Sequence, residues 1–339
     1  MLVLLPTLIA LSGAAVGFVV AYRLRRSVGF VRRSIVPHTA AATTAVVVRG
    51  VRFRMLGAVG VAAFVGLAVL PLRISDIPLG TIIAPGVGAA VGLVVLALSP
   101  FPRRVPDFGI RQAELTPRTV GAFGPRWGFT LPSTAVVALL ALLVVTGVSS
   151  STIDGVFSHE FTVVLPHAGT NTAGPYPGWS YGIPILAACA LLIAAMLFAL
   201  HRIAAAPRIG HRDASGLDSK LRATLTRFIM LAGTAVVVLY LGAVTLAAAS
   251  AARSASQWAY LKPSYWAHVC GQQATCSFAA TPADLVRGVV QPSYTLGAVG
   301  SVVGIVLIGV AFVLALLALT NLVIRWSVAT PNARETIDA

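Results

Sequence analysis

The sequence predicts an all-α integral membrane protein with about seven transmembrane helices, its amino terminus outside and its carboxyl terminus in the cytoplasm. Three observations lead to this prediction: a shortage of charge, several long apolar segments, and an uneven distribution of arginine. Of the 339 residues, 57% are hydrophobic and 10% are charged, whereas a soluble domain carries about 25% charged residues. Because a soluble domain must cover its surface with polar groups, we expect much of this surface to face lipid.

Seven segments are apolar over the length of about 20 residues that a helix needs to cross the hydrocarbon of a bilayer. They cover residues 2–21, 55–72, 79–98, 129–148, 183–200, 228–250 and 296–324. None of them contains Asp, Glu, Lys, Arg or His. Because a charge near the centre of a span costs about 2.5–3.5 kcal/mol on insertion scales, this favours all seven spans within one membrane domain, residues 1–339.

The basic residues set the predicted orientation. They gather after the first span, between the third and fourth, between the fifth and sixth, and in the tail, while the other loops hold only Arg73, Arg253, Lys262 and Arg287. The positive-inside rule places the arginine-rich segments in the cytoplasm. The first apolar run also precedes its arginine cluster, unlike a secretory signal, which indicates an uncleaved anchor. We expect a multi-pass protein of a bacterial plasma membrane.

Several classes of function are disfavoured by the sequence. The net charge of +15 is spread between apolar runs, so it does not form the single basic patch of a nucleic-acid-binding protein. There is no Walker A motif and no Gly-x-Ser-x-Gly motif. The last span has no Lys that could form the Schiff base of a retinal protein. We therefore predict no cofactor and no nucleic-acid partner.

Two sizeable loops, residues 149–182 and 251–294, are predicted on the exported side. Both are rich in Gly, Pro, Ser and Thr, which favours ordered turns over strands. Cys270 and Cys276 are close together in the second loop, and a disulfide between them would stiffen it in an oxidising compartment. Cys189 lies within the fifth span, where we expect a small buried apolar side chain.

A weak candidate site in the first exported loop contains four titratable residues: Asp154, His159, Glu160 and His167. The run from His159 resembles the start of a zinc-protease helix, but that motif needs a second His four residues later, and Val163 stands there. We therefore predict no metal site of that type. A looser metal or acid–base site is one hypothesis, and solvated loop residues are the alternative.

Residues 213–227 are predicted to form a cytoplasmic amphipathic helix that runs into the sixth span. Leu217, Leu221 and Leu225 recur at helical spacing, and Arg222 lies four residues after an aspartate, a spacing that suits an ion pair. One hypothesis is a docking helix for a cytoplasmic partner. The alternative is an interfacial helix lying on anionic headgroups.

Small residues recur at four-residue spacing in two spans, as Gly88 and Gly92 in the third and as Gly300 and Gly304 in the seventh. Such pairs let helix backbones approach closely. We expect tight packing within the chain, with a homodimer seam as the alternative.

Three hypotheses of function remain. The favoured one is a permease-like or accessory transport subunit without its own energy source, which acts with a cytoplasmic or membrane protein partner. The second is a sensor or assembly scaffold that uses the exported loops. The third is a membrane enzyme on a lipid-linked substrate, with a side chain of the weak loop site as acid or base. The chain is more simply explained as a non-enzyme.

Overall fold

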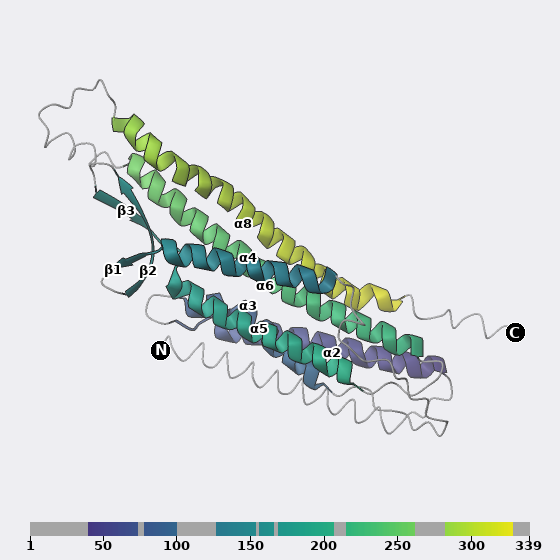
Figure 1. Ribbon diagram of the computed structural model, residues 1–339. Helices are drawn as coiled ribbons and strands as arrows, with labels where there is room; N and C mark the ends of the chain where they lie inside the picture. The colour runs from purple at the N-terminus through teal and green to yellow at the C-terminus, as the bar shows by residue number, and fades with distance from the viewer. Residues whose placement is uncertain are drawn as a thin grey trace, which may run out of the picture. The chain divides into compact units, whose positions relative to one another are not determined.

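The computed structural model describes residues 40–73, 78–99, 127–153, 156–165, 169–206, 215–261 and 282–327. The chain is mostly helical in this part, with one small sheet (Figure 1). The helices are α2 (Ala40–Val69), α3 (Leu79–Leu98), α4 (Trp127–Ser149), α5 (Trp179–Ala205), α6 (Ser215–Leu261) and α8 (Pro282–Ser327). The strands are β1 (Ser151–Ile153), β2 (Val156–Leu165) and β3 (Gly169–Ala173).

Six helices of the described part are long and apolar enough to cross a membrane. The candidate spans are Arg49–Val69, Leu79–Leu98, Phe129–Ser149, Trp179–Ala205, Ser219–Ser256 and Pro292–Thr320. They agree with six of the seven predicted spans. The remaining one, residues 2–21, lies outside the described residues.

The surface of these helices supports a membrane environment. Val148 of α4 is 75% exposed and Leu296 of α8 is 72% exposed, and both helices present further exposed Val and Leu side chains. Such apolar area would be unfavourable in water but is compatible with lipid. The chain is therefore a multi-pass membrane protein.

The chain folds as two compact units, each made from several stretches of sequence. Unit 1 comprises Met1–Ser133, Ala187–Val236 and Val313–Ala339, and unit 2 comprises Thr134–Leu186 and Val237–Phe312. The single membrane domain over residues 1–339 stays a prediction. In the sequence, unit 1 holds every Lys and Arg except Arg253, Lys262 and Arg287.

In unit 1, helices α2 and α3 pack through their smallest residues. A Cβ placed on Gly92 would lie 2.7 Å from the Ala58 carbonyl oxygen and 2.7 Å from the Ala62 Cβ. A Cβ on Gly88 would lie 2.5 Å from the Ala62 carbonyl oxygen. Only glycine allows this approach of two backbones. The predicted packing within the chain at these two glycines is confirmed.

Unit 2 contains a second seam of small residues, between α6 and α8. A Cβ on Gly304 would lie 2.9 Å from the Leu246 Cβ and 3.0 Å from the Gly242 carbonyl oxygen, and one on Gly300 would lie 2.9 Å from the Ala249 Cβ. The prediction of close packing within the chain at Gly300 and Gly304 is therefore confirmed as well.

The loop predicted to be exported, residues 149–182, contains a three-stranded antiparallel sheet in the order β1–β2–β3, which follows α4 and precedes α5 (Figure 1). The preference for turns over strands in residues 149–182 is therefore wrong, and the chain is not purely α-helical. The physical reason is local: the ten residues Val156–Leu165 are dominated by β-branched and aromatic side chains, which suit a pleated surface. The composition of the whole loop had concealed this stretch.

Helices α2, α6 and α8 extend well beyond the apolar segments of the sequence. Helix α2 begins at Ala40, so that Arg49, Arg52 and Arg54 lie on a helix and not in a loop. Helix α6 continues to Leu261 and α8 begins at Pro282, which shortens the predicted second exported loop. A charge interrupts an apolar segment but not helical hydrogen bonding, so helices can extend beyond that segment.

Candidate functional site

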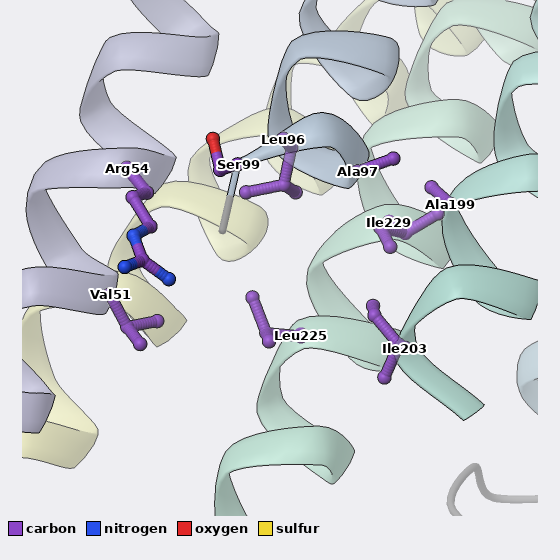
Figure 2. Close-up of a pocket in the computed structure, with 9 residues that line it drawn as sticks. All are labelled: Val51, Arg54, Leu96, Ala97, Ser99, Ala199, Ile203, Leu225 and Ile229. Atoms are coloured by element: carbon purple, nitrogen blue, oxygen red, sulfur yellow. The ribbon is translucent and has the colours of Figure 1, made fainter. Parts of the chain in front are cut away.

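The candidate site is a small cavity in unit 1 that is bounded by α2, α3, α5 and α6 (Figure 2). Its volume is about 20 Å³, which is room for about one water-sized group. It is lined by Val51, Arg54, Leu96, Ala97, Ser99, Ala199, Ile203, Leu225 and Ile229. Among its described lining residues the cavity is therefore mostly apolar, with one charged side chain, Arg54.

Helical spacing brings the lining residues together. Val51 and Arg54 are three residues apart on α2, and Leu225 and Ile229 are four apart on α6, so each pair shares one face of its helix. The α3 side is contributed by the end of that helix, near Ser99, which follows its last residue. Four separate elements thus each contribute one short face, and van der Waals packing between the adjacent residues holds these faces together.

Arg54 is the charged residue among those that line the cavity. Its side chain is half-buried and extends from α2 toward the space beside Leu225 (Figure 2). Within the described residues, the structure shows neither a hydrogen bond nor an ion pair to its guanidinium. The hydroxyl of Ser99 donates to the Val95 carbonyl at 2.8 Å and is therefore already used as a donor. Arg54 thus remains the charged donor available at this wall.

Sequence reasoning missed this site because Arg54 was assigned to a cytoplasmic loop. A signal for it is nevertheless present: Val51, Arg54 and Met55 have the i, i+3, i+4 spacing of one helical face. Val51 and Met55 are both buried in the structure. A half-buried arginine between two buried apolar residues is the pattern that separates this position from its exposed neighbours.

A second arginine, Arg222 of α6, caps the carboxyl end of α5 through its guanidinium. Its guanidinium donates to the carbonyl oxygens of Ile203 at 2.7 Å and Ala206 at 2.9 Å, with a longer contact to Ala204 at 3.4 Å. The last carbonyls of a helix have no partner within the helix, and a cation there also interacts favourably with the helix dipole. Arg222 therefore stabilises the junction of α5 and α6.

The segment predicted as an amphipathic helix is helical from Ser215 onward, as the first part of α6. Leu221, Arg222 and Leu225 are buried within unit 1, and the side chain of Leu217 lies outside the described part. The exposed positions on this turn are Ser219 and Lys220. The apolar stripe therefore packs against the chain itself, and docking of a partner stays a prediction that would have to use the exposed residues.

Arg227, one half-turn beyond Leu225, is also partly buried. Its Nε atom has no hydrogen-bond partner among the described residues. Such a donor is costly to bury without a partner. The described part of unit 1 thus combines three partly or fully buried arginines, at positions 54, 222 and 227.

Comparison of the chain with protein families, with curated proteins and with solved structures finds no match. The site must therefore be interpreted from its own geometry. Its features are a cation at the wall of an apolar cavity, in a unit that is rich in arginine. This arrangement suits an anionic group that carries an apolar portion.

The predicted exported-loop site is only partly described. Asp154 and His167 lie outside the described residues, while His159 and Glu160 occupy successive positions of β2. Successive side chains of a strand point to opposite faces, so these two do not converge through the strand alone. The described residues contain no group of three or more metal-ligating side chains. The acid–base hypothesis stays a prediction.

The sheet is fixed to the ends of the helices by several contacts within unit 2. The Tyr176 hydroxyl lies 2.6 Å from the Ser149 hydroxyl at the end of α4, and the Asn171 side-chain amide donates to the Ala255 carbonyl of α6 at 2.5 Å. The Tyr176 ring also packs on Phe161, with the ring centres 5.2 Å apart. Burial raises the pKa of Tyr176 and outweighs the opposing hydrogen bond from Ser149.

The cysteine predictions separate into two cases. Cys189 is a buried free thiol in α5, as the sequence predicts. Cys270 and Cys276 lie outside the described residues. Their disulfide therefore stays a prediction.

Proposed function

We propose that the protein is a non-enzymatic membrane component, a permease-like or accessory transport subunit that depends on a partner for its energy source. One observation carries this proposal: none of the six candidate spans contains Asp or Glu. Proton- and cation-coupled transporters place ionisable groups, usually with carboxylates among them, at membrane depth. A chain whose spans lack carboxylates is better suited to work beside a polypeptide that supplies the coupling.

The distribution of charge supports a topology for this proposal. The basic residues of the spans lie at the start of the α2 span, at the end of α5 and at the start of α6, with Arg253 as the exception. We propose that these ends are cytoplasmic, with seven spans, an exported amino terminus and a bacterial plasma membrane as the location. The sheet β1–β3 would then face the exported side, together with the proposed Cys270–Cys276 disulfide.

The partner is expected to bind near the exposed start of α6. The test places a photoreactive amino acid at position 220, in place of the exposed Lys220, and a second one at position 221, in place of the buried Leu221. The expected result is a stoichiometric crosslinked protein from position 220 and none from the adjacent control. Recovery of the chain alone from mild detergent, together with no product from position 220, would contradict the proposal.

A second candidate, a sensor or assembly scaffold, is favoured by the attachment of the sheet. Asn171 of β3 connects the sheet to α6 through its side-chain amide. Tyr176 connects it to α4, because its backbone N–H donates to the His159 carbonyl of β2 and its hydroxyl is hydrogen-bonded to Ser149. A force or ligand acting on the sheet would therefore be transmitted to the helix ends. Replacement of Asn171 by Ala should uncouple any exported stimulus from its response while leaving the protein in the membrane, and an unchanged response would remove this candidate.

A further inference from the structure

We propose that the cavity bounded by α2, α3, α5 and α6 binds an anionic phospholipid, with Arg54 as the ligand of its phosphate. The inference is independent of the transport proposal, because it depends only on the cavity and its surroundings. It starts from one observation: the Arg54 guanidinium lies at the apolar wall of the cavity, and none of the described residues forms a hydrogen bond or an ion pair with it.

The four helices around the cavity contain almost no negative charge that could serve as an internal partner. In sequence, α2, α3 and α5 contain no Asp or Glu, and α6 contains only Asp218. The same turns of α2 add the exposed Arg49 and Arg52. An anion from outside these four helices is therefore attracted to this end of α2, and a basic pocket between transmembrane helices is a recognised arrangement for lipid headgroups.

The apolar lining selects an amphiphile over a free anion. Val51, Leu96, Leu225 and Ile229 border the cavity beside Arg54 (Figure 2). With a volume of about 20 Å³, the cavity accepts only a short apolar portion of a ligand. The phosphate would pair with the accessible side of the half-buried guanidinium, and the adjoining glycerol carbons or first methylenes would contact the apolar wall. A guanidinium can bind a phosphate through two parallel hydrogen bonds.

Arg54 differs from Arg52 in a way that provides a matched control. The two residues lie on the same helix, two positions apart, but Arg52 is exposed whereas Arg54 lines the cavity. Replacement of either by Gln removes one positive charge from the same end of α2. A general electrostatic attraction would be weakened equally by both substitutions, and a site at the cavity would be weakened by Arg54→Gln alone.

The experiment titrates the purified full chain in neutral detergent with short-chain phosphatidylglycerol, short-chain phosphatidylcholine and inorganic phosphate, and follows thermal stability. For the wild type and R52Q we expect phosphatidylglycerol to bind about tenfold more tightly than phosphatidylcholine, and for R54Q this preference should be lost. The variant R54K should retain part of the preference, since it keeps the charge but not the planar donor pair.

Three outcomes would overturn the inference. The first is an unchanged preference in R54Q, which would place the lipid elsewhere. The second is an equal loss in R52Q and R54Q, which would indicate diffuse attraction. The third is binding of inorganic phosphate as tight as that of phosphatidylglycerol, which would indicate a site for free anions. Each variant is first compared with the wild type by elution volume and circular dichroism. If R54Q does not fold, the lipid preference of R54K is compared with that of R52Q instead.

Discussion

The contact of Arg222 with the end of α5 allows a quantitative prediction about stability. Replacing Arg222 by Met keeps an unbranched side chain of moderate length but removes the guanidinium. The carbonyls of Ile203 and Ala206 then lose donors at 2.7 and 2.9 Å. Both residues are about 95% buried, so water cannot readily replace the lost donor. Two charge-assisted hydrogen bonds at about 1.5–3 kcal/mol each give an upper range of about 3–6 kcal/mol.

Part of this loss is recovered, because a buried guanidinium also carries a desolvation cost that Met does not. We therefore expect R222M to lower the free energy of unfolding by about 2–4 kcal/mol. The measurement is equilibrium unfolding of the purified protein in mixed micelles at increasing SDS, followed by tryptophan fluorescence. The Trp179 side chain, in α5, provides one of the probes.

The matched control is R202M, because Arg202 lies in the last turn of α5 but is exposed. Its effect should stay below about 0.5 kcal/mol, as for most surface substitutions. The variant R222K should fall between the two, because an ammonium keeps the charge at the helix end but lacks the planar donor pair. If R222M unfolds within about 0.5 kcal/mol of the wild type, Arg222 does not stabilise the α5 end and the reasoning is wrong.

Three further predictions follow, and the two that concern glycines each have a matched control position on the same helix or its seam partner. G92V should lower stability by several kcal/mol, because its Cβ meets the α2 backbone, whereas G60V on α2 has open space around it and should change stability by less than about 1 kcal/mol. By the same reasoning, G304L should reduce the thermal midpoint strongly and G309L little; equal midpoints would contradict the α6–α8 seam. Because burial raises the pKa of Tyr176 above its ordinary value of 10.0, its phenol stays protonated in the folded protein, so its contribution to stability is complete below pH 10 and is lost as the pH rises through the folded pKa. Absorbance at 295 nm should show this late ionisation in the wild type and lose it in Y176F.

The membrane spans could be predicted from the sequence because hydrophobic length is a local property. The third predicted span, residues 79–98, has the same bounds as α3, and the fourth differs from its candidate span by a single residue. In lipid each backbone donor must be satisfied within its own segment, which forces a long apolar run into a helix. Few alternatives compete with that requirement, so the prediction needs no knowledge of tertiary structure.

The sheet and the cavity depend on information of different kinds. The strand signal in Val156–Leu165 was local and available, but it was averaged with the Gly- and Pro-containing remainder of its loop. The cavity, in contrast, requires Val51, Leu96, Ile203 and Leu225 to meet from four helices. Hydropathy does not specify which faces meet, because Leu and Val suit lipid and protein equally well in a membrane.

The small-residue seams show what replaces the hydrophobic effect between these helices. Lipid tails are as apolar as leucine, so two spans gain little by hiding apolar side chains from one another. They gain more from close backbone contact, and the carbonyl of Ala58 lies within 2.7 Å of the Cβ position at Gly92. Because the six described spans contain no carboxylate, an ion pair between two of these spans cannot add to the stability of the helix pairs. The stability of the helix pairs therefore depends on glycine at a few positions, and a single methyl group at such a seam should cost more than the loss of a surface charge.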